Sequence, residues 1–217
     1  MFGWLSNLKH IKHVNYMGIV SETKEQKINE ILNNAMQVLA KNGYENTTIA
    51  SIAAAAGVSR GIIHYYFSNK EDLVSKVLAY SSEKIIQSTI KDIRGNTEEE
   101  IADNIINDCI HSFREYPEFY GFLFEMWCAS RRSDKIKNEL IICSDKVAHS
   151  IKKVLDEAVQ NELLKIDDEN TEEMAKVLLA LFNGIAFEKL MHSSKDLDSR
   201  KYWIQVRNII SLFLKPL

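Results

Sequence analysis

Apolar residues recur at helical spacing along nearly the whole chain. Between residues 24 and 43 they fall on one helix face, with Ile28, Ile31, Leu32 and Ala35 at the i, i+3, i+4 and i+7 positions. Gly43 ends this helix at a position that favours glycine. No stretch alternates apolar and polar residues as a half-buried strand does. The pattern therefore predicts an all-α protein.

Helix-capping residues and turn signals divide the rest of the chain into further helices. Thr47 or Thr48 caps a short second helix, and Ser59 caps a third. Ser68 followed by Glu71 reads as a capping box that opens a fourth helix, running to about residue 93. Five more helices, about nine in all, are expected from Thr97, from Pro117 and over about 133–164, 171–192 and 199–214.

The second and third helices have the composition of a helix-turn-helix. Ile52 and Ala53 fall on one face of the second helix, and the small Ala53 lets another helix cross closely. Gly57 permits a left-handed turn before Ser59. In the third helix we expect Ile63, Tyr66 and Phe67 on the inward face and Arg60, Gly61, His64 and Tyr65 on the outward face. Such a motif presents its second helix to a DNA groove.

The outward residues offer the chemistry that DNA recognition requires. Arg60 suits a guanine or a phosphate, and Gly61 lets the backbone approach closely. His64 and Tyr65 add hydrogen-bonding groups and flat apolar area. Lys70 lies in the first turn of the fourth helix, where a cation opposes the helix dipole unless a phosphate lies nearby. The alternative for Lys70 is a solvated side chain.

Composition limits the class of protein. The chain has 217 residues, of which 46% are hydrophobic and 26% charged, as in ordinary globular proteins. Its apolar runs are far shorter than the ~18 residues of a membrane span. Cys109, Cys128 and Cys143 are widely spaced and odd in number, which favours reduced thiols in a cytoplasmic protein. We expect no cofactor and no metal site.

Charge is unevenly distributed along the chain. Residues 1–90 carry 9 Lys and Arg against 7 Asp and Glu, a balance of +2, whereas residues 91–217 carry 18 against 23, a balance of −5. A polyanionic partner should therefore meet the N-terminal third. Residues 1–20 are basic, partly apolar and too interrupted for a secretory signal. They are either an N-terminal arm without stable structure or an extension ahead of a start at Met17.

The segment "GYENTTIASIAAAAGVSRGIIHYYFSNKEDLVSKVL" resembles the DNA-binding domain of the TetR family of bacterial one-component regulators. The resemblance covers residues 24–78 and departs at His64, where the family most often has tyrosine. The C-terminal part matches no subfamily signature, although its length fits. The residues that carry the resemblance are Gly43-Tyr44, Thr47-Thr48, Ile52-Ala53, Ala56-Gly57-Val58-Ser59, Gly61, Tyr66-Phe67, Lys70-Glu71 and Leu73.

The resemblance implies an arm at 1–20, a helix-turn-helix DNA-binding domain at 21–68, and a ligand-binding and dimerisation domain at 69–217. The expected function is that of a ligand-responsive repressor that binds a palindromic operator as a homodimer and is released by a small hydrophobic or amphipathic effector. Contacts with double-stranded operator DNA are expected from Thr47, Thr48, Ser59, Arg60, Gly61, His64, Tyr65 and Lys70.

Aromatic residues are dense in the middle helices, which fits either core packing or an apolar ligand cavity. The resemblance places the effector pocket in this region. Gly184 lies inside a predicted helix, where glycine costs about 1 kcal/mol relative to alanine, so a close backbone approach or a pocket wall is expected there. The candidate ligand-binding residues are Cys109, His111, Phe113, Phe122, Glu125, Met126, Trp127, Asn183 and Phe187.

The last two predicted helices are apolar nearly all round, which requires burial from both sides. The resemblance implies that they form a four-helix dimer interface, and the alternative is a large monomeric core. The candidate interface residues are Leu178, Leu181, Phe182, Trp203, Val206, Ile210 and Phe213.

Three other functions remain open from the sequence. A transcriptional activator would have the same residues as a repressor, and an architectural DNA-binding protein would lack the effector. An all-helical enzyme is less favoured, because the chain contains no G-x-G-x-x-G, H-E-x-x-H or G-x-S-x-G motif and no phosphate-cradling lysine loop. We therefore expect no enzymatic activity.

Overall fold

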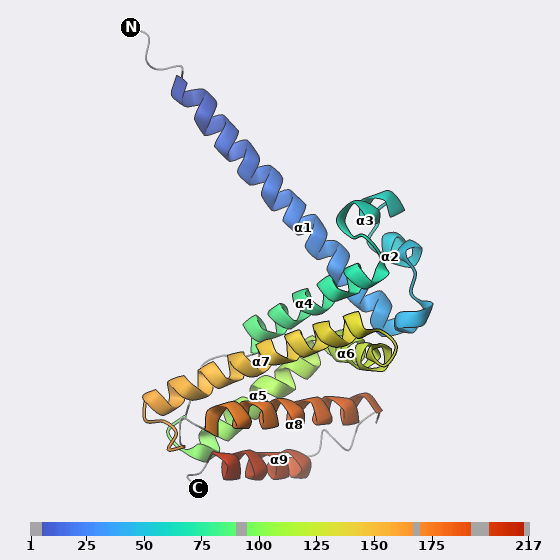
Figure 1. The fold of residues 1–217 in the computed structure, drawn as a ribbon. Helices are drawn as coiled ribbons and strands as arrows, with labels where there is room; N and C mark the ends of the chain where they lie inside the picture. The colour runs from blue at the N-terminus through green and yellow to red at the C-terminus, as the bar shows by residue number, and fades with distance from the viewer. Residues whose placement is uncertain (1–5, 90–94, 167–169, 192–199, 215–217) are drawn as a thin grey trace.

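The computed structural model describes residues 6–89, 95–166, 170–191 and 200–214, with side chains from Lys24 onward. Within these ranges the regular structure consists of nine helices, α1 to α9, as Figure 1 shows. This confirms the prediction of an all-α chain with about nine helices. Among the described helices, none is both long and apolar enough to cross a membrane.

The N-terminal unit is formed by α1 (Ser6–Asn46), α2 (Ile49–Ala55) and α3 (Arg60–Tyr66), with the start of α4 (Lys70–Thr89) packed beside them (Figure 1). Its apolar side chains share one buried cluster with α6 and α7. The cluster includes Ile31, Leu39, Ile52, Ile63, Phe67, Leu73, Phe122 and Met126, all of them 1% exposed or less. The N-terminal unit and the rest of the chain therefore share a hydrophobic core.

The first helix begins earlier than the periodicity indicates. α1 starts at Ser6, whereas the pattern predicts a start near Lys24, and residues 1–5 of the predicted arm lie outside the described part of the chain. Gly43 interrupts the helical backbone with φ 76° and ψ 164°, at the residue where the pattern places the helix end. The α1 axis thus changes direction just before α2.

The cap of α4 differs from the predicted capping box. Asn69, not Ser68, is the capping residue, because its Oδ1 accepts a hydrogen bond from the Asp72 N–H at 2.8 Å. Asp72 Oδ2 in turn accepts from the Ser68 N–H at 2.9 Å. The Asp72 side chain thus reaches back to the residue before the cap, and not to the cap itself as in a capping box.

The C-terminal bundle comprises α5 (Glu98–Glu115), α6 (Pro117–Ser130), α7 (Asp134–Gln160), α8 (Thr171–Met191) and α9 (Arg200–Phe213). Thr97 opens α5 as predicted, accepting from the Glu100 N–H at 3.2 Å, and Ser133 caps α7, accepting from the Ile136 N–H at 3.3 Å. A second buried cluster joins α5, α7, α8 and α9. The predicted helix ends near residues 93, 192 and 199 lie outside the described residues.

Candidate functional site

The outward face of α3 is the most exposed part of the N-terminal unit that sequence reasoning singled out. Ser59 caps the helix, its Oγ accepting from the Ile62 N–H at 3.3 Å. Arg60, Gly61, His64 and Tyr65 are all exposed, Tyr65 by 73% of its surface. The structure therefore brings these residues together on one solvent-facing surface, while Ile63 anchors the helix in the core.

Ile62 is a residue of this surface that sequence reasoning missed. Its side chain is 39% exposed, although it is large and apolar. The signal was present in the periodicity, because successive helix residues point about 100° apart and Ile63 was already assigned to the inward face. An exposed isoleucine on a protruding helix gives the surface an apolar point among polar side chains.

The two threonines before α2 have different environments. Thr47 is 1% exposed, and its hydroxyl donates to the Gly43 carbonyl at 2.7 Å, so its side chain belongs to the core and not to the predicted DNA-binding surface. Thr48 is exposed and caps α2, its Oγ1 accepting from the Ser51 N–H at 3.1 Å. Of this pair, Thr48 alone presents a hydroxyl near the surface.

Lys70 has an intramolecular partner. Its Nζ donates to the Tyr44 carbonyl oxygen and lies 4.1 Å from the centre of the Tyr44 ring. Burial lowers the pKa of Lys70, against a smaller opposite effect of Glu45. The cation in the first turn of α4 is thus balanced by a carbonyl and an aromatic face, without a phosphate. Lys70 joins the start of α4 to the end of α1.

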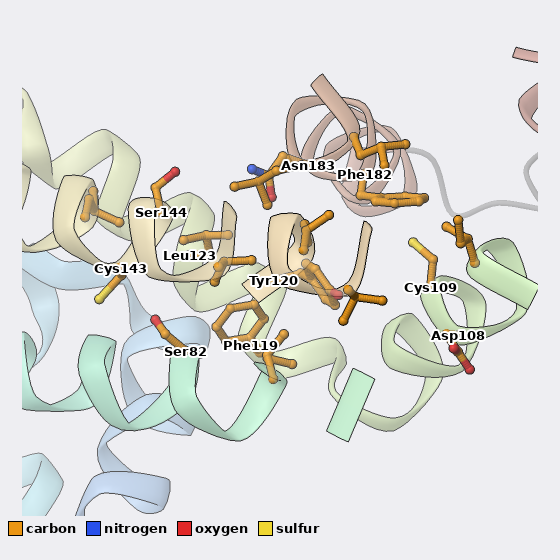
Figure 2. Close-up of a pocket in the computed structure, with 18 of the residues that line it drawn as sticks. Ser82, Asp108, Cys109, Phe119, Tyr120, Leu123, Cys143, Ser144, Phe182 and Asn183 are labelled. Carbon is orange, nitrogen blue, oxygen red and sulfur yellow. The ribbon is translucent and has the colours of Figure 1, made fainter. Parts of the chain in front are cut away.

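A cavity of about 190 Å³ lies inside the C-terminal bundle. Helices α4 to α8 all contribute side chains to its wall, as Figure 2 shows. The wall is mostly apolar, and Phe119, Tyr120, Trp127 and Phe182 supply aromatic surface. The polar groups on it are those of Ser82, Asn104, Asp108, Ser144 and Asn183, together with the Tyr120 hydroxyl.

Three of the predicted ligand-binding residues, Cys109, Trp127 and Asn183, line this cavity. Phe187 lines a smaller recess between α6 and α8, which shares Tyr120, Leu123, Trp127 and Asn183 with the cavity. The other predicted residues do not line either space. His111 is exposed, Phe113 packs edge-to-face on Tyr120 at 4.8 Å, Phe122 and Met126 are fully buried in the core, and Glu125 lies against Gly43.

Most of the cavity wall was missed in the sequence. Helix α7 contributes a stripe at helical spacing, namely Leu140, Cys143, Ser144, Val147, Ile151, Val154 and Leu155, and α4 contributes Ser82 and Ile85. Such a stripe is identical in sequence to one that packs in a core. The periodicity therefore identifies the inward face without revealing that part of it borders empty space.

Two thiols and a tyrosine hydroxyl border the cavity in an environment that disfavours their ionised forms. Burial raises the pKa of Cys109 and of Cys143. Burial also raises the pKa of Tyr120, whose hydroxyl shares a 2.7 Å hydrogen bond with Ser112 Oγ. At neutral pH these groups are therefore uncharged, in keeping with an apolar cavity.

Besides the shared hydrophobic core, polar side chains of the bundle contact the N-terminal unit and the start of α4. Glu125 of α6 packs on Gly43. Ser133 Oγ, at the start of α7, donates to Glu71 Oε1 of α4 at 2.8 Å. Arg132 forms an exposed ion pair with Glu45 at 3.2 Å, which contributes little by itself. The same α6 helix carries cavity residues on one face and contacts α1 on another.

The predicted dimer residues divide into buried and exposed groups. Leu178, Val206 and Ile210 are buried in the second core cluster, and Phe182 lines the cavity. Leu181 and Trp203 are half-buried against that cluster, and Phe213 is exposed. The apolar side chains that α8 and α9 leave exposed are Val177, Leu190, Met191, Ile209, Leu212 and Phe213.

Comparison with known proteins extends over both units. The model of the family described as bacterial regulatory proteins, tetR family, matches residues 31–77. The fatty acid metabolism regulator protein of Bacillus subtilis is 35% identical over 71 residues, which are 33% of this chain and 37% of that protein. The HTH-type transcriptional regulator SrpR of Pseudomonas putida is 24% identical over 192 residues, 88% of this chain and 87% of that protein.

A solved structure shares the fold of nearly the whole chain. The transcriptional regulator FadR from Bacillus subtilis, in complex with stearoyl-CoA, superposes with a TM-score of 0.64 at 19% identity, covering 85% of this chain and 96% of that one. The exposed recognition helix, the family match over the unit that carries it and the shared architecture agree. Residues 31–77 thus match the tetR family of bacterial regulatory proteins, and the chain as a whole is similar in sequence to the regulator SrpR and in fold to FadR.

Proposed function

We propose that the protein is a ligand-responsive repressor that binds a palindromic operator as a homodimer and releases it when a small apolar or amphipathic effector occupies the cavity. The observation that carries this proposal is the cavity of about 190 Å³ bordered by α6, the helix that also packs against α1. Operator binding places the protein in the cytoplasm with the DNA.

The cavity wall indicates the chemistry of the effector. An apolar protein cavity of about 150 Å³ holds a benzene molecule, so the present one has room for a ring system or a short chain. Among the described lining residues, Asp108 is the one with an acidic side chain, and none is basic. Burying a charged group without a partner is costly, so the apolar part of an effector would lie inside and a charged head near the rim.

An acyl chain is one effector class that fits this description. The FadR structure that shares this fold holds stearoyl-CoA. In the present chain, the recess lined by Phe124, Phe187 and Leu190 adjoins the cavity between α6 and α8. Opening of the shared wall formed by Tyr120 and Trp127 would extend the space for a longer chain.

Release of the operator is a shift between two conformations. An effector that enlarges the cavity pushes on Phe119, Tyr120 and Leu123 of α6 and on Ser82 and Ile85 of α4. Both helices contact α1, and α4 begins at Lys70, which holds the Tyr44 carbonyl. A hundredfold loss of operator affinity requires only about 2.7 kcal/mol of coupling, within the range of known allosteric proteins.

The test starts from DNA selected by the protein out of random-sequence duplexes. Operator affinity is then measured by fluorescence anisotropy with decanol, decanoic acid or stearoyl-CoA as the added probe. We expect at least one probe to weaken binding tenfold or more. A Val147→Trp variant, which fills the cavity, should bind the operator normally and lose this response, whereas Ile141→Trp, on the exposed side of α7, should keep it.

Two outcomes would contradict the proposal. Failure to enrich any duplex would remove the DNA-binding function. An unchanged response in Val147→Trp would show that the probe acts elsewhere than the cavity. A transcription assay with the selected operator between promoter and reporter separates a repressor, which lowers the transcript level, from an activator, which raises it.

A further inference from the structure

Ile62 is an apolar side chain at the tip of a helix that is otherwise polar on its outer face. Among the described large aliphatic side chains of α1 to α3, it is the most exposed, at 39%. The neighbouring Ile63 is completely buried and anchors the same helix. Ile63 therefore supplies the core contact of this helix, and Ile62 leaves 39% of its surface free for a partner.

The structure holds Ile62 in a fixed position. Its N–H donates to both Ser59 Oγ and the Ser59 carbonyl, at 3.3 and 3.1 Å, so the residue sits in the first, capped turn of α3. A β-branched side chain in a helix has one strongly preferred χ1 rotamer. Little conformational entropy is therefore left to lose when a partner contacts Ile62.

The surface beside Ile62 is bare. Apart from its two chain neighbours and the nearby helix backbone, a Cβ atom on Gly61 would meet only the Ser59 Oγ within 4 Å, at 3.6 Å, so no side chain from elsewhere in the described protein covers this position. Arg60 and His64 lie on the same exposed face. The result is a rigid apolar knob next to a strip of backbone, with polar groups on either side.

In the major groove of DNA the apolar group that faces such a knob is the C5-methyl of thymine. Cytosine offers a hydrogen-bond donor at the edge of its base, which an isoleucine would leave without a partner. On the basis of the proposed function, we infer that Ile62 determines operator specificity by contacting the methyl group of one thymine in each half-site.

The size of the effect follows from the area of one methyl group. Burial of one such group strengthens binding about fourfold, and two symmetric half-sites multiply this to about fifteenfold. The contact is separable from the phosphate contacts, which fix affinity but carry no sequence information. It should therefore appear as a difference in affinity between two duplexes that have the same charge and the same Watson–Crick hydrogen bonds but differ by the methyl group.

Replacement of thymine by deoxyuridine makes this comparison, because it removes the methyl group alone. The operator is selected with the wild-type protein, and each symmetric pair of thymines is then replaced in turn. We expect replacement of one of these thymine pairs to weaken binding of the wild-type protein about fifteenfold. The Ile62→Ala variant should bind the normal operator less tightly and should not distinguish the two duplexes. Ile141→Ala, which removes a similarly exposed isoleucine on α7, should behave as wild type.

Each result supports or overturns the inference. Equal wild-type affinity for every substituted duplex overturns it and leaves the proposed function intact. Retention of the full thymine preference by Ile62→Ala also overturns it, because another side chain, such as Tyr65, then reads the methyl group. If no duplex is enriched in the selection, the proposed function fails and this inference with it.

Discussion

The carboxylate of Glu125 on α6 lies directly against Gly43, the residue at which α1 changes direction. A Cβ atom at position 43 would stand 3.0 Å from Glu125 Oε2. The backbone of Gly43, with φ 76° and ψ 164°, is in a region that is almost restricted to glycine. Backbone conformation and close packing therefore both require glycine at this point of contact between the two units.

We expect Gly43→Ala to lower the free energy of unfolding by about 1–3 kcal/mol, since the alanine is strained and also displaces Glu125. Urea denaturation measures the change. Combining Gly43→Ala with Glu125→Ala should recover only the part of the lost stability that comes from the clash with the Glu125 side chain. Gly57→Ala is the matched control, because φ is 62° and nothing lies within 4 Å, so it should show backbone strain alone. Equal stability of Gly43→Ala and wild type would contradict this account.

Lys70 should contribute to the structure more than to phosphate binding. Because its Nζ is engaged by the Tyr44 carbonyl and ring, Lys70→Met should lower the stability of the protein and leave the salt dependence of operator binding nearly unchanged. Loss of a phosphate contact would instead reduce the slope of log affinity against log salt by about 1. Arg60→Ala, on the exposed face of α3, is the comparison variant.

The sequence predicted the helices, most of their caps and the outward face of α3. It did so because caps and helical periodicity are local properties that tertiary packing leaves unchanged. It did not predict that Thr47 is buried or that Lys70 binds a carbonyl of α1, because each depends on a partner brought close only by folding. The cavity was expected among α5, α6 and α8, but its α4 and α7 walls were missed because their apolar stripes are indistinguishable from core in sequence.

Leu212 is expected to be part of the dimer interface, since it is 68% exposed and lies on α9. Exposed apolar residues on α8 and α9 form a different face from Val206 and Ile210, which are buried within the protomer. Leu212→Arg should weaken the dimer by about tenfold or more, given about 1.5–3 kcal/mol for burying a large apolar side chain. Sedimentation equilibrium measures this, and Ile141→Arg on α7 should leave the dimer intact.

The three cysteines should react at different rates with a maleimide. Cys128 is exposed, whereas burial of Cys109 and Cys143 raises the pKa of each thiol and limits access. We expect Cys128 to be labelled first and the other two at least tenfold more slowly. An effector in the cavity should further slow the labelling of Cys109 and Cys143. Mass spectrometry of the labelled peptides measures the rate at each cysteine. Uniform labelling of all three thiols would argue against the cavity.

The cap of α4 should make stability depend on pH. The hydrogen bond from the Ser68 N–H, with a smaller effect of Lys76, holds the pKa of Asp72 below its usual value. A carboxyl group with a lower pKa in the folded state stabilises the protein above its unfolded-state pKa, and this stabilisation is lost as the pH falls through the folded-state pKa.

Asp72→Asn should therefore lose less stability than wild type between pH 6 and pH 3, when thermal unfolding is followed by circular dichroism. At pH 7, Asn69→Ala should cost about 1 kcal/mol, the usual value of a helix N-cap. Parallel acid profiles of Asp72→Asn and wild type would show that this carboxyl group has no part in acid sensitivity.

Because α6 both lines the cavity and contacts α1, its residues should be constrained differently from those of α7 during evolution. Substitutions in the cavity wall of α7 at Val147, Ile151 or Val154 alter what is sensed and lie away from α1, so selection can retune them separately. Changes on α6 affect both functions at once, since Phe119 and Leu123 line the cavity while Glu125 lies against Gly43 in the N-terminal unit. New inducers should thus be acquired mainly through α7 and α8, with α6 altered last.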